Sequence, residues 1–140
     1  MIYKSHQGPV RCLHWFDDDS GFISGGWDGN VFAWHLYVNK NDVKDGKDCN
    51  PKFAFTHKNF QFACVANKPE SKDIVYAADV DKSVKQIHNG KETDRYEAGV
   101  NISQIQVLNG GKAMVCGIAE NDRPGSIQVV KLPFERALEV

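Results

Sequence analysis

Histidine, cysteine and acidic side chains are the groups of this 140-residue chain that could catalyse a reaction or bind a metal. Zinc sites need His and Cys at short, fixed spacings. No C-x-x-C pair occurs, and the five histidines stand apart without ligand spacing: His6, His14, His35, His57 and His88. We therefore expect no metal site, no cofactor and no enzyme activity.

Other catalytic or ion-binding interpretations fail on single residues. Gly110-Gly111-Lys112-Ala113 lacks the upstream glycine and the hydroxyl of a phosphate-binding loop. A calcium loop at residues 39–48 would put Val43 at a ligand position and Lys52 where a glutamate is needed. Asp17-Asp18-Asp19 could bind a cation or a basic partner, but a polar turn of this kind is more typical of a solvated loop.

The remaining polar residues are spaced as short strands and turns would place them. Asp28-Gly29 separates two alternating apolar runs, which predicts a tight hairpin because Gly adopts positive φ at little cost. Asp17 to Gly21 forms a polar, Gly-ended connection between the strands Val10 to Trp15 and Phe22 to Ser24. Residues 6–36 therefore read as an antiparallel meander of three strands.

This stretch resembles a repeat of the WD-repeat family, whose blades are four-stranded antiparallel sheets of a β-propeller. His6 precedes the first strand, Ser24 lies on the second, Asp28 in the following turn and Trp34 on the third. The resemblance implies that these four side chains form a buried hydrogen-bonded chain. His35 stands where the family often has the second Asp of its name.

Two weaker copies of the repeat follow. Asp81, Val84 and Ile87 lie 53 residues after Asp28, Val31 and Trp34, in the same order. Ala77 and Ile87 stand at the positions of Ser24 and Trp34, so we expect Asp81 to have lost its partners and this blade to depend on apolar packing. His57 is a candidate for the position of His6. In the third copy, Gly125 follows Gly29 by 96 residues.

We therefore predict an all-β, WD40-type β-propeller of about three four-stranded antiparallel blades. The first spans residues 1–57 with a long surface loop at 37–51, the second, degenerate, residues 58–99, and the third, also degenerate, residues 100–140 with an exit strand. Closed propellers have four to eight blades. We expect an incomplete ring, belonging to a longer polypeptide or completed by another chain.

Composition argues against several partner classes. The net charge of −1 and the interspersed charges give no reason to expect nucleic acid or an anionic membrane. The sequence shows no secretory signal and no apolar run of about 20 residues. Three of the cysteines, Cys12, Cys64 and Cys116, fall inside predicted strands, and with Cys49 we expect them to be reduced thiols in the cytosol.

The succession of all three repeats resembles WD-repeat proteins of the ciliary axoneme, on residues 6–15, 81–87 and 125–133. The resemblance implies a non-catalytic scaffold in cilia or flagella, part of a long protein with tandem propellers and coiled coil. It further implies contacts with doublet microtubules and with inner dynein arms. The alternative is a cytosolic adaptor that binds a partner peptide through its top face.

Trp27 and Arg11 are the candidate partner-binding residues. Trp27 directly precedes the Asp28 turn, at a position that in the WD-repeat family looks out from the top face. Arg11 alternates out of the predicted core between Val10 and Cys12. Trp27 has two interpretations, either a partner contact or a side chain folded onto the neighbouring blade.

Overall fold

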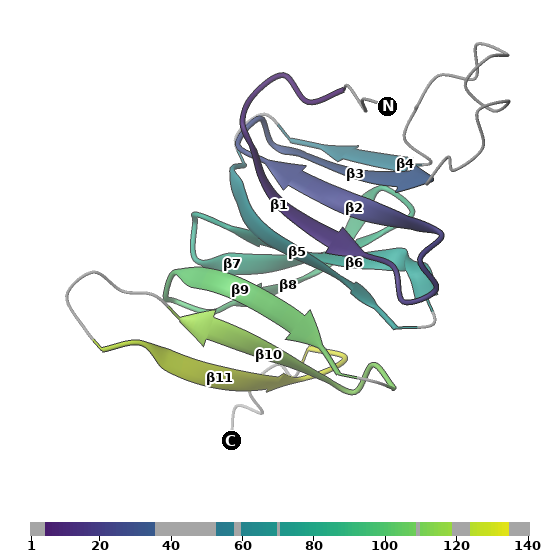
Figure 1. Ribbon diagram of the computed structural model, residues 1–140. Helices are drawn as coiled ribbons and strands as arrows, with labels where there is room; N and C mark the ends of the chain where they lie inside the picture. Colours follow the sequence, from purple (N-terminus) through teal and green to yellow (C-terminus); the bar gives the residue numbers. More distant parts are fainter. Residues whose placement is uncertain are drawn as a thin grey trace, which may run out of the picture.

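The computed structural model describes residues 5–35, 53–57, 60–69, 71–108, 110–118 and 124–134. Within these residues the chain forms eleven strands in three antiparallel sheets, which we call blades 1, 2 and 3, and no helix. The blades follow one another through the molecule, from purple and blue to green and yellow in Figure 1. The prediction of an all-β fold built from antiparallel blades is confirmed.

Each blade is a meander in which sequence order and spatial order agree. Blade 1 contains β1 (Val10–Trp15), β2 (Gly21–Gly26), β3 (Asn30–His35) and β4 (Phe53–Thr56). Blade 2 contains β5 (Phe62–Lys68), β6 (Ser71–Asp79), β7 (Ser83–His88) and β8 (Lys91–Glu97). Blade 3 contains β9 (Ile102–Val107), β10 (Ala113–Ile118) and β11 (Ser126–Lys131). Residues 132–134, which we expected to lead outward as an exit strand, form a turn in which Leu132 and Phe134 are buried.

The hairpin between β2 and β3 closes at Gly29, whose φ of 78° favours glycine. A Cβ atom on this residue would lie 2.0 Å from the carbonyl oxygen of His57. The backbone amide of His57 donates a hydrogen bond of 2.9 Å to the carbonyl oxygen of Gly29. The tight turn therefore also joins blade 1 to the segment that leads into blade 2.

Strand register confirms the internal repeat. Ser24 pairs with Phe32 in blade 1, and Ala77 pairs with Lys85 in blade 2, both 53 residues later. In blade 3 the equivalent pair is Cys116 with Gln128. The spacing grows by four residues between β10 and β11, where the connecting turn is longer than the Asp28-Gly29 turn. Structurally equivalent residues can therefore be compared across the three blades.

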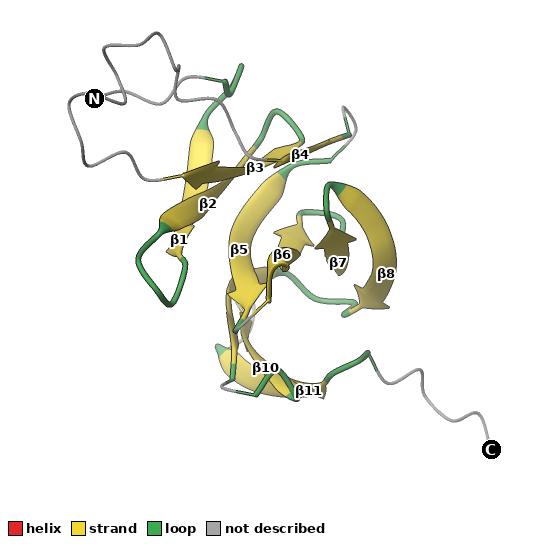
Figure 2. Ribbon diagram, turned by 90° about the vertical axis from the view of Figure 1, so that its right-hand side faces the viewer, coloured by secondary structure: helices red, strands yellow, loops and turns green. Residues whose placement is uncertain are grey.

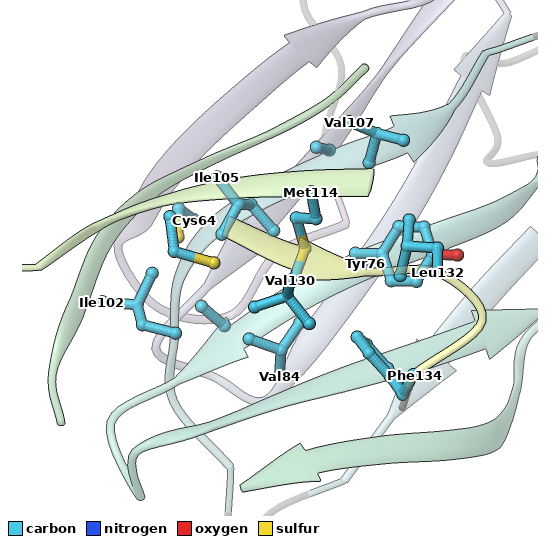
Figure 3. Packing of buried hydrophobic residues seen from close by; sticks show 13 residues of the cluster. Cys64, Tyr76, Val84, Ile102, Ile105, Val107, Met114, Val130, Leu132 and Phe134 are labelled. Carbon is cyan, nitrogen blue, oxygen red and sulfur yellow. The ribbon is translucent and has the colours of Figure 1, made fainter. Parts of the chain in front are cut away.

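The core lies between the blades rather than within a single sheet. Apolar side chains of β2 and β3 pack against those of β5 and β6, around Ile23, Val31 and Val65. A second cluster lies between blades 2 and 3 and includes Tyr76, Met114 and Phe134, which Figure 3 shows from close by. Burying each such side chain stabilises the fold by roughly 1.5 to 3 kcal/mol, so each blade depends on its neighbour.

The inner strands provide most of the contacts from one blade to the next. β5 lies against β1 and β2 of blade 1, and β9 lies against β5 and β6 of blade 2. Figure 2 shows β5 between the sheet of blade 1 and the strands of blade 3. The described part of the chain contains no helix that could cross a membrane.

Candidate functional site

Blade 1 brings its four predicted polar residues into one chain of hydrogen bonds. His6 Nδ1 lies 3.1 and 3.0 Å from the two carboxylate oxygens of Asp28. His6 Nε2 lies 2.7 Å from Ser24 Oγ, and Trp34 Nε1 donates to the same oxygen over 2.8 Å. The indole can only donate, so Ser24 Oγ accepts from Trp34. The ionised Asp28 carboxylate can only accept, so His6 Nδ1 donates to it, and in the neutral imidazole Nε2 is then the acceptor for the Ser24 hydroxyl.

Asp28 is the acceptor on which this chain converges. The backbone amides of Gln7 and Asn30 donate to its carboxylate over 2.8 and 3.1 Å, and the Asn30 side-chain amide donates over 2.8 Å. Burial alone raises the pKa of Asp28, but the hydrogen bonds from Asn30, Gln7 and His6 outweigh burial and hold the pKa below its usual value. Asp28 is therefore a structural anion that holds the loop before β1 against the β2–β3 turn.

Aromatic rings surround the hydrogen-bonded chain on the same face of blade 1. The His6 ring lies edge-on to Phe32 at 4.7 Å between centroids, and Phe32 lies edge-on to Trp34 at 5.6 Å. Phe22 stacks on Trp34 at 6.2 Å. Each polar group in the chain thus has a partner within an apolar surrounding, where an unpaired group would be costly.

Blade 2 contains a different polar network, and the expectation that Asp81 had lost its partners is wrong. Lys85 Nζ donates to Asp81 over 2.8 Å and also to Ser83 Oγ, and it lies 3.6 Å from Asp79. The amide and hydroxyl of Ser83 donate to Asp81 over 3.0 and 2.6 Å. The Lys85 side chain has 0% exposure, so blade 2 does not depend on apolar packing alone.

The equivalences explain how the second network arose in the same fold. Lys85 stands at the position of Phe32, Ser83 at that of Asn30, and Asp79 at that of Gly26. Burial raises the pKa of Asp81, but the hydrogen bonds from Lys85 and Ser83 dominate and lower it overall. Asp81 therefore keeps the acceptor role of Asp28 while its donors come from β7 instead of from a preceding histidine.

In blade 2 the ring that lies against Lys85 belongs to Phe60, and His57, the predicted counterpart of His6, stacks on Phe60. Lys85 Nζ lies 4.4 Å from the centroid of the Phe60 ring, and the His57 ring stacks on Phe60 at 3.9 Å. In blade 1 a histidine bound to an aspartate lies against a phenylalanine. In blade 2 a lysine bound to an aspartate lies against a phenylalanine.

The described residues of blade 3 do not repeat the polar chain of blade 1. Cys116 and Val130 stand at the positions of Ser24 and Trp34, and both are buried in the cluster between blades 2 and 3. Gln128, at the position of Phe32 and Lys85, donates from Nε2 to the hydroxyl of Tyr96 on β8 over 2.8 Å. This bond joins blade 3 to the outer strand of blade 2.

The two candidate partner-binding residues lie in contact. The Arg11 guanidinium carbon is 4.8 Å from the centroid of the Trp27 ring, and Trp27 is 45% exposed. The register of β1 against β2 is irregular between Val10 and Cys12, and this bulge leaves Arg11 unpaired beside the β2–β3 turn. Val80 is equivalent to Trp27 in blade 2 and is 48% exposed. The turns of both blades thus present an apolar side chain to solvent.

No three His, Cys, Asp or Glu side chains gather in a metal-binding arrangement among the residues that the structure describes. Cys12, Cys64 and Cys116 are free, and burial raises the pKa of their thiols to about 12, about 12 and about 11. Such thiols stay protonated and are weak nucleophiles and ligands. Cys49 and residues 39–48, where we considered a calcium loop, lie outside the described residues.

Comparison with known proteins agrees with this geometry. Residues 1–35 match the family model WD40, described as WD domain, G-beta repeat. This match covers β1, β2 and β3 of blade 1. A chain of the crystal structure of the mitotic checkpoint complex superimposes with a TM-score of 0.68 at 21% sequence identity, covering 92% of this chain and 41% of that chain. This likeness shows the WD40 propeller fold.

Two curated relatives align with nearly the whole chain. Cilia- and flagella-associated protein 57 C of Tetrahymena thermophila is 28% identical, covering 96% of this chain and 10% of that protein. Cilia- and flagella-associated protein 57 of Mus musculus is 27% identical, covering 95% of this chain and 10% of that protein. The chain thus spans a tenth of the length of these relatives.

Sequence reasoning missed Asp79, Ser83 and Lys85. These residues and Asp81 alternate along the chain, which places them on one side of the strand and turn. Lys85 lies on β7 between Val84 and Gln86, at the position of the buried Phe32. This charged residue at a core position is the signal that could have revealed the second network.

Proposed function

We propose that this chain is part of a non-catalytic WD-repeat scaffold of the ciliary or flagellar axoneme. The similarity to two proteins named for cilia and flagella, which extends over nearly the whole chain, is the observation that carries this proposal. The buried polar networks support a structural role, because their donors and acceptors serve one another and not a substrate. The scaffold binds other axonemal proteins, including components of doublet microtubules and inner dynein arms.

A tagged copy of the protein in a ciliated cell tests this role. We expect the tag in detergent-extracted axonemes and its release together with inner dynein arm proteins at high salt. Recovery of the tagged protein exclusively from the soluble cytosol would contradict the proposal. A copy carrying Lys85→Met, which removes the buried cation of blade 2, serves as a control that the axonemal signal requires a folded propeller.

The contact between Arg11 and Trp27 favours a second candidate, an adaptor that binds a partner peptide on the edge formed by the blade turns. A half-exposed tryptophan ring beside a guanidinium group offers both an apolar surface and a partner for a carboxylate. Peptides selected from a displayed library on the wild-type chain are the probe. Trp27→Ala should abolish their capture, whereas Trp15→Ala, which removes another exposed tryptophan, should not. Unchanged capture by Trp27→Ala would count against this candidate.

A further inference from the structure

Each of the three inner strands contains a β-bulge at the same place. The pairing of β1 with β2 shifts at Arg11, that of β5 with β6 at Ala63, and that of β9 with β10 at Ser103. A bulge leaves its extra residue out of the hydrogen-bonded ladder and redirects its side chain. The fold therefore sets apart three equivalent residues, one in each blade.

These three bulge residues line one hollow of about 230 Å³, which we call the inner hollow. It extends over β1, β5 and β9, with β5 between the other two strands (Figure 2). Ala63 belongs to blade 2, which has a described blade on either side, and it is still only half-buried. The inner hollow is therefore open also where a blade is packed on both of its sides.

Arg11 is the charged residue of the inner hollow at neutral pH. Burial lowers the pKa of His14, which also lines the hollow, so its imidazole is neutral at pH 7. The thiols of Cys12 and Cys64 have a pKa of about 12 and are neutral as well. No carboxylate is among the described residues that line the hollow, and none of the ion pairs among the described residues includes Arg11. A ligand in the hollow thus meets a single positive charge.

The ring of Trp27 provides an apolar surface beside this charge. The Arg11 guanidinium lies over that ring, and a guanidinium in this position keeps N–H groups of its edge available for a planar carboxylate. Trp27 is 45% exposed, and its equivalent Val80, in the blade with neighbours on both sides, is 48% exposed. The exposure of this turn position is therefore a property of the blade, and Arg11 and Trp27 together fit a carboxylate next to an apolar side chain.

We propose that the inner hollow binds an acidic segment of a partner protein, in which an aspartate or glutamate carboxylate pairs with Arg11 and a neighbouring apolar side chain lies on Trp27. The proposal rests on the second candidate function, the adaptor that uses these two residues. One guanidinium matches the single charge of a carboxylate with two parallel N–H donors. The exposed side-chain amide of Gln104 on β9 is a further donor in the lining of the same hollow.

Fluorescence anisotropy with two matched sets of labelled peptides tests the proposal. Each peptide of the first set contains one tryptophan or leucine between two glutamates, and the second set has glutamine in place of each glutamate. We expect the glutamate set to bind the 140-residue chain at least about tenfold more tightly, since a hydrogen bond to a charged group contributes about this factor. Arg11→Gln should remove the difference. Lys91→Gln, which removes an exposed cation of β8 outside the hollow, should preserve it.

A substitution that changes no charge tests the hollow itself. Ala63→Leu fills the inner hollow from blade 2 and leaves Arg11 and Trp27 in place, so it should weaken binding of the glutamate set by a similar factor. Circular dichroism checks that all variants keep the β fold. Equal binding of the two peptide sets, or unchanged binding by a folded Ala63→Leu chain, would overturn the proposal.

The same titration on the longer protein to which we assign this chain distinguishes a partner from a segment of the same polypeptide. We expect the glutamate set to bind the longer protein as tightly as the 140-residue chain. Loss of binding in the longer protein would show that its own polypeptide fills the hollow, and it would overturn the proposal.

The outcomes also separate this proposal from the adaptor function on which it rests. If Trp27→Ala abolishes capture of the peptides selected from the displayed library while the glutamate and glutamine sets bind alike, the adaptor function stands and the carboxylate proposal fails. If Trp27→Ala leaves that capture unchanged, the adaptor function fails, and the carboxylate proposal fails with it.

Discussion

Blades 1 and 2 are both four-stranded meanders, and they bind the aspartate of the turn between their second and third strands with different side chains. Each must hold an aspartate in the turn between its second and third strands. Blade 1 does so with His6, Ser24 and Trp34, and blade 2 with Lys85 and Ser83 on a single strand. Blades 1 and 2 therefore both keep a hydrogen-bonded carboxylate at this turn, but they use different donors.

Removing one residue has different consequences in the two polar networks. The chain in blade 1 joins mostly neutral groups to one carboxylate, so a deletion leaves hydrogen bonds unmade. The network in blade 2 contains a fully buried lysine and the nearly fully buried carboxylate of Asp79. Removing one ion of such a set leaves a charge uncompensated, which costs more than a lost hydrogen bond. We therefore expect a substitution in the network of blade 2 to lower the free energy of unfolding more than a substitution in the network of blade 1.

The largest effect is expected for Lys85→Met. The substitution keeps much of the side-chain volume but leaves Asp79 and Asp81 without their cation, and we expect the free energy of unfolding to fall by about 3 kcal/mol. Urea unfolding followed by circular dichroism measures this loss. Adding Asp79→Asn in the same chain should restore part of the stability. A loss below that of Ser24→Ala would contradict the ranking of the two networks.

Ser24→Ala should have the next largest effect. It leaves both the Trp34 indole N–H and His6 Nε2 without their shared partner, so we expect a loss of about 2 kcal/mol in the same unfolding experiment. Trp34→Phe keeps a buried ring but removes the donor. If the hydrogen bonds of blade 1 act as a unit, the double variant Ser24→Ala/Trp34→Phe will lose less unfolding free energy than the sum of the two single losses. Strict additivity would show that the bonds act independently.

Phe60→Leu should destabilise the protein by about 1 kcal/mol, because leucine preserves burial but removes the ring that faces the Lys85 ammonium group. The background of Lys85→Met provides the control. In that background the same substitution should cost clearly less, since the cation is already gone. An equal loss in both backgrounds would mean that Phe60 acts only through packing.

The smallest effect is expected from acid. Hydrogen bonding holds the pKa of both Asp28 and Asp81 below the ordinary value of 3.8. A carboxyl group whose pKa is lower in the folded state stabilises the fold when the pH is above the pKa of the unfolded chain. This stabilisation is lost as the pH falls through the folded-state pKa. The free energy of unfolding should therefore decline below a pH of about 4. Asp28→Asn should make the stability decline less steeply with falling pH. An unchanged pH profile in that variant would contradict a contribution of Asp28 to the decline.

Strands with alternating apolar residues and tight glycine turns were predictable from the sequence. The meander of blade 1 and the positions of His6, Ser24, Asp28 and Trp34 follow from such local patterns and from the resemblance to WD repeats. β8 was not predicted as a strand, because its residues Lys91 to Glu97 are mostly charged and carry no apolar alternation. It forms a strand because β7 offers it a hydrogen-bonding edge, and its charged side chains suit an exposed outer strand.

The sequence by itself determined the repeat, because a constant offset of 53 residues places equivalent residues at equivalent points of blades 1 and 2. It also determined which aspartate lies in the β2–β3 turn of blade 1 and in the β6–β7 turn of blade 2. Only the tertiary structure decided what binds Asp81, since the answer depends on the register of β6 against β7 and on the burial of Lys85 beside Phe60. A lysine is ordinarily exposed. Its charge is stable in the core here because two aspartates and a hydroxyl, brought together by the pairing of distant segments, surround it.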